Sequence, residues 1–284
     1  MNGLLVIDKP GGMTSRDVVN RVQRMFPRRT KIGHTGTLDP LATGVLVVCV
    51  GAATRLADFV QAMGKSYASR FRLGATSDTD DADGTVTETR SVSIPTREQL
   101  EEALTRFVGE IQQVPPAYSA LKLDGVRAHN LARQGKSPDL AARRVRVDAV
   151  RLLAYEYPFA DVEIDCGKGT YIRSIARDAG AVLGCGGMVQ TLRRTRVGAF
   201  RAEDGIGLDG TPTLLPMALA LGEMRRVSAT DDAVRRLRQG QVMPLMAVVE
   251  IGTRVAVIDE RGELVGIGTV EPAGVRPEIV FHIP

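Results

Sequence analysis

The sequence predicts an α/β protein of the α+β type, in which a large domain precedes a small β-rich module. Segments typical of strands are interleaved with amphipathic segments typical of helices, and strand patterns predominate after a Gly-, Pro- and Thr-rich stretch at 210–216. The chain has 284 residues, 44% of them hydrophobic, which is enough for a large core and a smaller second one. We expect domains over 1–215 and 223–284.

The first predicted elements are a strand and a helix. Residues 3–8, with an apolar run at 4–7, indicate the strand, and Lys9-Pro10-Gly11-Gly12 turns the chain. Thr14 or Ser15 then caps a helix with an inward stripe of Val18, Val19, Val22, Met25 and Phe26. The glycines do not form a Walker-type phosphate loop, because such a loop ends in Gly-Lys-Ser/Thr and here Lys9 precedes them.

The next segment, 33–44, reads Gly-His-Thr-Gly-Thr-Leu-Asp-Pro-Leu-Ala-Thr-Gly and leads into the apolar run 45–50. Three glycines and a proline exclude a regular helix, so we expect a shaped loop that ends in a buried strand. The loop contains one carboxylate, Asp39, and one imidazole, His34. From spacing alone, Asp39 is either a functional carboxylate or a turn former before proline, and both interpretations stay open.

Three further elements follow in the first half of the chain. Residues 53–63 show a helical stripe, residues 65–73 alternate as a strand, and residues 96–110 form an amphipathic helix that begins with a capping box. The inward side chains of this last helix are Leu100, Leu104, Phe107 and Val108. By position alone, Tyr67 in the alternating strand could equally be a core aromatic.

Between these elements lies an acidic cluster that precedes a glycine: Asp78, Asp80, Asp81 and Asp83. It does not fit a calcium-binding loop, because the positions that require Asp and a bidentate Glu hold Thr79 and Arg90. We therefore expect no metal there. On the residues alone, the cluster is interpreted as a solvated turn between strands.

The second half of the large domain begins with a polar and basic segment of weak periodicity at about 115–140, which includes Lys122 and Arg133. Strands are predicted at 145–153 and 162–166, and Thr170 opens a helix with Arg173 in its first turn. The inward side chains of this helix are Ile172, Ile175, Ala176, Ala179 and Val182. In the C-terminal module we expect a helix at 231–239 and strands at 254–258 and 264–270.

Composition argues against several classes of protein. The net charge of +4 is only mildly basic, so it is compatible with a polyanionic partner without requiring one. The three cysteines form no C-x-x-C pair, which argues against a disulfide framework or a zinc site and fits a reduced cytoplasm. We find no basic leader and no apolar run near the ~20 residues of a membrane span, so we expect a soluble cytoplasmic protein.

Five motifs occur in order along the chain. They are Leu5-Val6-Ile7-Asp8-Lys9-Pro10, the loop 33–44, Lys65-Ser66-Tyr67, Gly167-Lys168-Gly169-Thr170-Tyr171-Ile172-Arg173-Ser174 and Leu192-Arg193-Arg194. Together they resemble the TruB family of tRNA pseudouridine synthases over about the first 200 residues. The resemblance implies a pseudouridine synthase fold with a central mixed, largely antiparallel sheet flanked by helices. It also implies a thumb-like RNA-clamping insertion at about 115–140 and a C-terminal PUA-like RNA-binding module.

The resemblance further implies roles for individual residues. Asp39 is expected to be the catalytic carboxylate, Tyr67 to stack on the target base and relay a proton, and Arg173 to orient an ionised Asp39 through a bidentate pair. The implied substrate-binding residues are Lys9, His34, Thr37, Lys122, Arg133, Tyr171 and Leu192. Among these, Lys9 with Pro10 would support the floor of the active site, His34 would fill the gap left by a flipped base, and Leu192 would line the pocket. The acidic cluster would be a loop near the RNA.

The implied reaction is the isomerisation of uridine at position 55 of tRNA to pseudouridine. The resemblance also implies a monomer that binds the T stem-loop of tRNA. No cofactor and no metal are expected. Whether Asp39 attacks C1′ or acts through deprotonation at C2′ stays open. Two alternatives also stay open. One is a relative guided by a small RNA within a protein complex, against which the lack of basic extensions argues; the other is a tRNA-binding folding factor that needs no catalysis. An intact set of Asp39, Tyr67 and Arg173 favours an enzyme.

Overall fold

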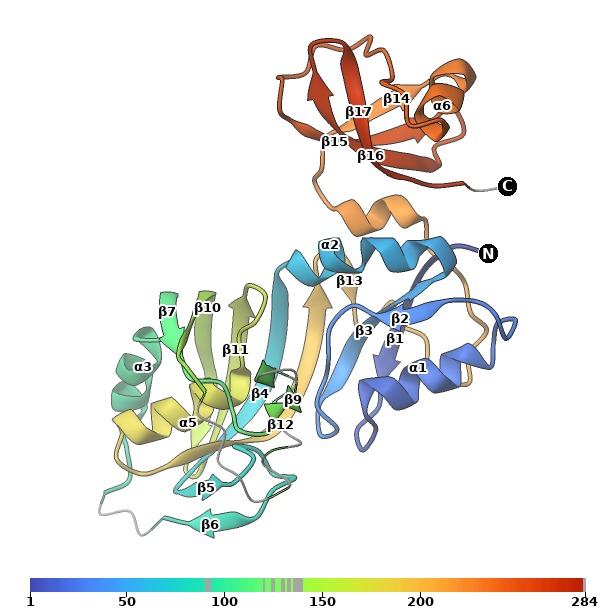
Figure 1. Ribbon diagram of the computed structural model, residues 1–284. Helices are drawn as coiled ribbons and strands as arrows, with labels where there is room; N and C mark the ends of the chain where they lie inside the picture. The colour runs from blue at the N-terminus through green and yellow to red at the C-terminus, as the bar shows by residue number, and fades with distance from the viewer. Residues whose placement is uncertain are drawn as a thin grey trace.

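The computed structural model describes residues 1–89, 93–119, 121–123, 126–128, 131, 134 and 140–282. It confirms the predicted class: a nine-stranded sheet carries helices on its faces, and a separate four-stranded sheet follows in the C-terminal part (Figure 1). The large sheet has the order β1-β3-β12-β4-β11-β10-β7, with β2 paired to β3 and β13 to β12. Among its described pairings only β12 with β3 is parallel, so the sheet is mixed and largely antiparallel, as expected.

The elements have the following bounds. The large sheet comprises β1 Gly3–Lys9, β2 Ile32–His34, β3 Thr43–Val50, β4 Lys65–Leu73, β7 Gly109–Gln113, β10 Arg143–Glu156, β11 Phe159–Cys166, β12 Gly187–Val197 and β13 Phe200–Arg201. The helices around it are α1 Ser15–Gln23, η1 Gly51–Leu56, α2 Ala57–Ala62, α3 Arg97–Thr105 and α5 Ile172–Val182. Two short hairpins pair β5 Ala75–Ser77 with β6 Val86–Glu88, and β8 Lys122–Leu123 with β9 Val126–Arg127. The C-terminal part contains η2 Met217–Leu221, β14 Arg226–Ala229, α6 Asp231–Arg238, β15 Arg254–Asp259, β16 Leu264–Glu271 and β17 Gly274–Val280.

Some predicted boundaries are wrong. The helix expected over 96–110 ends at Thr105, because Gly109 adopts a φ of 101° and begins β7, which pairs with β10. The helix expected to open at Thr170 begins at Ile172. Val108 and Val182 were assigned inward positions, yet they are 44% and 45% exposed, because each lies at or beyond the end of its helix.

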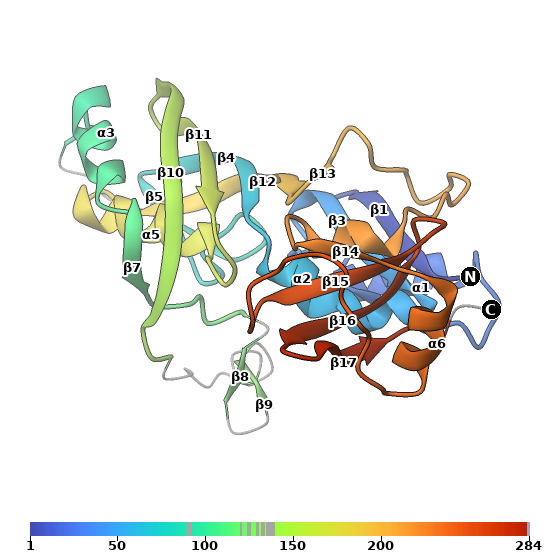
Figure 2. The same ribbon diagram turned by 90° about the horizontal axis from the view of Figure 1, so that it is seen from above.

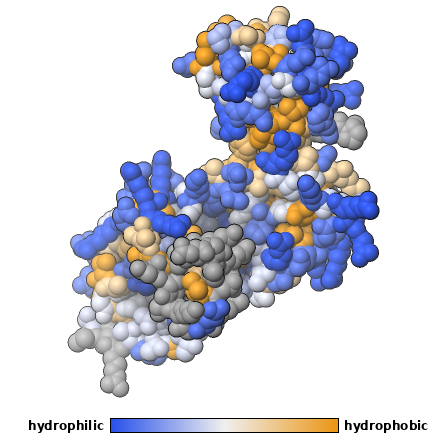
Figure 3. Space-filling view, in the orientation of Figure 1, coloured by the Kyte–Doolittle hydropathy of each residue, from blue (hydrophilic) through white to orange (hydrophobic). Residues whose placement is uncertain are grey.

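The strand patterns place two cores on opposite faces of the large sheet. One core lies under α1, α3 and α5 and includes Tyr67 and Phe71 of β4. The other lies under η1, α2 and η2 and includes residues of the C-terminal sheet, such as Ile267. The C-terminal module therefore packs against the N-terminal part of the large domain, and it lies over the N-terminal strands in the second view (Figure 2). Hydrophilic side chains cover much of the face in Figure 3, and apolar surface gathers where this module meets the large domain, with smaller apolar spots elsewhere.

The Gly-, Pro- and Thr-rich stretch predicted as a boundary is bound to β1. The backbones of Leu4 and Leu215 exchange hydrogen bonds of 3.0 and 2.8 Å, and the N–H of Ile206 donates to the carbonyl of Val6 at 3.0 Å. These contacts cover the free edge of β1, which would otherwise expose unpaired backbone groups. Within the described residues, no helix has the length and apolar character needed to cross a membrane.

Candidate active site

The loop between β2 and β3 presents Asp39 on a firmly held backbone. The hydroxyl of Ser15, at the start of α1, donates to the carbonyl of Leu38 at 3.1 Å and accepts from its N–H at 2.8 Å. The Leu38 side chain is buried in the core. On the other side of Asp39, the N–H of Gly12 donates to the carbonyl of Pro40 at 2.9 Å. A carboxylate held in this way is preorganised for a chemical role.

Lys9 supports the same loop from inside the protein. Its side chain has no exposed surface, and its ammonium donates to the carbonyls of Pro10, Met13 and Pro40 at 2.9, 2.7 and 3.3 Å. Burial lowers the pKa of Lys9 to about 8, against the opposing effect of the Asp39 charge. The buried Lys9 side chain has no surface for direct contact with substrate, and it supports the backbone next to Asp39, as the resemblance implies for the Lys-Pro pair.

The position of Gly44, at the end of the loop, requires a glycine. Its φ is 98°, and a Cβ there would lie 2.1 Å from the carbonyl oxygen of Arg194. This close approach occurs where β3 runs parallel to β12 and Gly44 pairs with Arg194. A larger residue would push the Asp39 loop away from the Leu-Arg-Arg motif.

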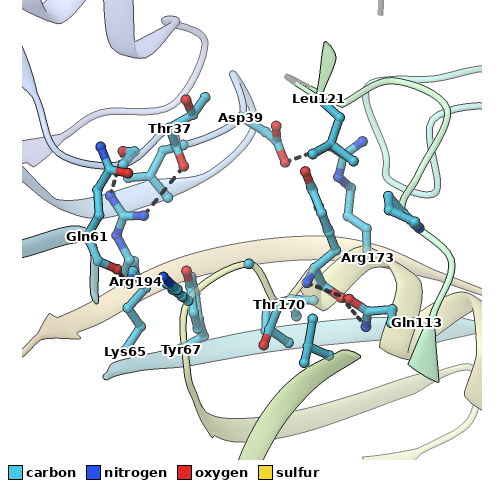
Figure 4. Close-up of a pocket in the computed structure, with 18 of the residues that line it drawn as sticks. Thr37, Asp39, Gln61, Lys65, Tyr67, Gln113, Leu121, Thr170, Arg173 and Arg194 are labelled. Atoms are coloured by element: carbon cyan, nitrogen blue, oxygen red, sulfur yellow. Dashed lines mark hydrogen bonds and ion pairs between the residues drawn. The ribbon is translucent and has the colours of Figure 1, made fainter. Parts of the chain in front are cut away.

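Arg173 binds Asp39, as Figure 4 shows, and it also binds a second carboxylate. Its Nη2 lies 2.9 Å from Oδ2 of Asp39, and its Nη1 lies 3.3 Å from Oδ2 of Asp81. The same nitrogens donate to the carbonyls of Tyr118 and Thr79 at 2.9 and 2.7 Å. The predicted contact with Asp39 is present, but the predicted bidentate geometry is wrong, because the guanidinium divides its two arms between two carboxylates.

Asp81 is a member of the site that sequence reasoning missed. It is 3% exposed, and its Oδ1 accepts hydrogen bonds from the Thr79 hydroxyl at 2.6 Å and from the N–H of Asp83 at 3.1 Å. Burial raises the pKa of Asp81, while the bond from Thr79 and the charge of Arg173 oppose this shift. The interpretation as a solvated turn is therefore wrong for Asp81, whereas Asp78 and Asp83 of the same turn are exposed. The nearby arginines are far away in the sequence, so spacing contained no signal for this pairing.

The opposite side of the cavity carries Tyr67, Lys65 and Arg194 (Figure 4). Tyr67 of β4 pairs in register with Arg194 of β12. Burial raises the pKa of Tyr67, although the charge of Arg194 acts in the opposite direction. The Lys65 ammonium donates to the carbonyls of Gln61 and Met63 at 2.8 and 2.7 Å, and burial lowers its pKa to about 8.

These residues line a cavity of about 530 Å³, a size that suits a small organic group. Its lining brings together six of the predicted site residues: Thr37, Asp39, Tyr67, Tyr171, Arg173 and Leu192. The amide of Gln113, in β7, donates to the carbonyl of Tyr171 at 3.0 Å and accepts from its N–H at 2.8 Å. Gln113 thus fixes the start of the helix that presents Arg173, a contact across 58 positions that the sequence did not indicate.

Other predicted site residues are not brought into the cavity. His34 ends β2, where it pairs with Val48, and it does not belong to the cavity lining. Lys122 lies in β8, and Arg133 falls outside the described residues. Over the part of the chain that the structure describes, no group of His, Cys, Asp and Glu side chains is arranged to hold a metal ion.

Comparisons with protein families and named relatives agree with one another. The family model described as TruB family pseudouridylate synthase (N terminal domain) matches residues 23–172, and the one described as tRNA pseudouridylate synthase B C-terminal domain matches residues 173–210. A protein of Ruegeria sp. (strain TM1040) named tRNA pseudouridine synthase B is 43% identical over 99% of this chain and 96% of its own. The protein of that name from Mycobacterium bovis (strain BCG / Pasteur 1173P2) is 41% identical over 97% of this chain and 98% of its own.

Solved structures share the architecture. The structure of an H/ACA RNP bound to a substrate RNA containing 2′-deoxyuridine contains a chain that superimposes with a TM-score of 0.75 and 25% identity, covering 99% of this chain and 85% of that one. A chain of the Cbf5-Nop10-Gar1 complex superimposes with a TM-score of 0.73 and 26% identity, covering 98% and 84%. Both similarities therefore include the large sheet and the C-terminal sheet.

Proposed function

Because the chain belongs to the TruB family of pseudouridylate synthases, we propose that it isomerises uridine at position 55, in the T arm of tRNA, to pseudouridine. The reaction breaks the N1–C1′ bond, turns the uracil and joins C5 to C1′. It needs a carboxylate at the sugar, a cavity that retains the detached base and a group that takes the C5 proton. The observation that carries the proposal is the position of Asp39, bound to Arg173, at a cavity that also contains Tyr67.

The two sides of the cavity suit different parts of the reaction. Asp39 and Arg173 face the sugar, and Tyr67 and Leu192 hold the base. The Tyr67 ring offers a stacking surface, and its raised pKa keeps the hydroxyl protonated near neutral pH, so that it can donate a proton. A cavity of about 530 Å³ accepts the target only after the uridine leaves its stack, at a cost of a few kcal/mol.

Direct action on tRNA is favoured over guidance by a second RNA. The relatives that are 41% and 43% identical over nearly the whole chain are named as tRNA enzymes, whereas the H/ACA structures are 25% and 26% identical. A folding factor that needs no catalysis would not require Arg173 to be shared between two buried or half-buried carboxylates.

The test is incubation of the purified protein with an unmodified tRNA transcript, followed by mapping of pseudouridine at each position. We expect modification at a single uridine of the T arm, and none in a transcript that carries cytidine there. Modification that appears only after a guide RNA is added would favour the alternative. A protein that binds the transcript without modifying it would contradict the proposal.

A hollow beside the N-terminus suggests where phosphates bind. Arg29, Lys31 and Arg55 line it, and none of them forms an ion pair with another described residue. In contrast, the exposed Arg70 and Arg151 of the large sheet pair with Asp161 and Asp165, respectively. Cations without carboxylate partners are suited to neutralise RNA phosphates.

We therefore expect tRNA affinity to fall steeply with salt, with each neutralised contact contributing about 0.7 to 0.9 to the log–log slope. The triple variant Arg29→Gln, Lys31→Gln, Arg55→Gln should reduce this slope by about 2 to 3. The control, Arg70→Gln with Arg151→Gln, should leave it unchanged. Equal slopes for the wild type and the triple variant would exclude these cations from RNA binding.

A variant of Asp81 tests whether catalysis depends on the ion pair between Arg173 and this second carboxylate. Asp81→Asn keeps the size and one acceptor, but it removes the charge that holds the second arm of Arg173. We expect the single-turnover rate to fall about 10- to 100-fold, because a small displacement of Arg173 also displaces Asp39. Asp83→Asn, an exposed neighbour, is the matched control and should retain the wild-type rate. A wild-type rate for Asp81→Asn would show that the Asp81 charge is not needed to position Arg173.

A further inference from the structure

Arg194 is a second buried guanidinium at the cavity, and among the described residues no carboxylate pairs with it. It is 3% exposed, its Nε donates to the carbonyl of Val45 at 2.8 Å, and its Nη1 and Nη2 donate to those of Thr37 and Gly36 at 3.4 and 3.2 Å. It forms no ion pair with any residue that the structure describes, whereas Arg173 contacts two carboxylates. The two guanidinium groups are therefore electrostatically different.

The surroundings of Arg194 make this side of the cavity positive. Lys65 lies nearby in the same lining, and burial and the Arg194 charge both lower the pKa of Lys65. Backbone carbonyl dipoles solvate a guanidinium without cancelling its charge, and a buried cation without a counterion is unfavourable. Such a charge is most valuable where an anion forms during a reaction.

The proposed reaction forms an anion in this cavity. When N1–C1′ breaks, the electron pair stays on N1, so the detached uracil carries one negative charge shared by N1, O2 and O4. If Asp39 attacks C1′, an ester bond forms as N1 leaves; if Asp39 takes the C2′ proton, a C1′–C2′ double bond forms. Both routes release the same anion. Bond formation from C5 to C1′ consumes the charge, the carboxylate is restored, and the C5 proton is lost while N1 gains one.

We propose that Arg194 is a catalytic residue that stabilises the uracil anion while the base is detached. This inference rests on the proposed function. In it, Arg194 acts on the uracil leaving group and Asp39 acts on the ribose. The cation is preorganised by three backbone carbonyls, so it needs no rearrangement when the charge appears. Tyr67, its register partner, then keeps the plane of the base close to the guanidinium.

The first comparison removes the charge and then restores it. Arg194→Gln should lower the single-turnover rate on tRNA about 10²- to 10³-fold, the usual loss when a stabilising donor is removed. Arg194→Lys keeps a cation at the site and should be about tenfold faster than Arg194→Gln. The matched control is Arg193→Gln, because Arg193 pairs with Asp8 at 2.9 and 2.8 Å and does not line the cavity.

The second comparison changes the leaving group. The ring of 4-thiouridine is more acidic than that of uridine, so it carries negative charge more easily and needs less help from a cation. With 4-thiouridine at the target position, the ratio of the wild-type rate to the Arg194→Gln rate should shrink about tenfold relative to the ratio on uridine. Arg193→Gln should show the same ratio on both substrates.

The outcomes separate this inference from the proposed function. Equal losses for Arg194→Gln on the two substrates would mean that Arg194 only holds the Asp39 loop, and the inference would be wrong. If Arg194→Gln fails to fold, as seen by circular dichroism, the same ratios are measured with Arg194→Lys, whose shorter and displaced charge should still give a smaller defect on 4-thiouridine. A wild-type protein that is inactive on tRNA would instead contradict the proposed function.

Discussion

Asp39→Asn should abolish isomerisation while it leaves tRNA affinity within a few-fold of the wild type. Asparagine has the size of aspartate, and the contacts of Ser15 and Gly12 that hold the loop involve the backbone of Leu38 and Pro40. The amide can neither attack C1′ nor take a proton from C2′, so we expect the rate to fall about 10⁴-fold or more. Single-turnover rates and dissociation constants on one transcript separate the two effects.

The control for this variant is Asp58→Asn. Asp58 is an exposed acid in the first turn of α2, and it does not line the cavity. It should retain wild-type rate and affinity. A rate near that of the wild type for Asp39→Asn would remove Asp39 from the chemistry, and a loss of affinity equal to the loss of rate would assign it to binding.

Arg173→Met should lower both the rate and the stability. The side chain is 4% exposed, and it contacts Asp39, Asp81 and the carbonyls of Thr79 and Tyr118. Breaking a buried ion pair by removing one partner costs about 3 to 5 kcal/mol. Because the Asp39 side chain is 32% exposed, most of the loss comes from Asp81 and the two carbonyls, and we expect about 3 kcal/mol. The rate should fall about 10³-fold.

Arg177→Met is the matched control for Arg173→Met. Arg177 lies one turn further along α5, pairs with Asp80 at 2.9 Å and donates to the carbonyl of Val114, but it does not line the cavity. It should reduce the free energy of unfolding in a urea titration with a much smaller effect on the rate. Equal rate losses for the two variants would mean that Arg173 acts through the stability of α5 and not through Asp39.

Local patterns were sufficient for much of the fold. The alternation of 65–73 predicted β4, and the capping box at Thr96 predicted where α3 begins. Helix ends were less well predicted, because Gly109 continues into a strand that exists only through its pairing with β10. In the C-terminal module, β14 and β17 were missed for the same reason: each is defined by its pairing with a neighbouring strand, which the local sequence does not indicate.

For the site, the motif match brought Asp39, Tyr67 and Arg173 to attention, and all three line one cavity. The sequence by itself determined this set, since the glycines and proline of the loop and the strand and helix periodicities constrain the local backbone. Only the tertiary structure decided the charges around them. Asp81 pairs with Arg173, Lys9 bonds to Pro40, and Arg194 bonds to the carbonyl of Thr37, each through contacts between segments far apart in the chain. The interaction between two charges depends on their distance in space, and the separation of two residues along the sequence does not determine that distance.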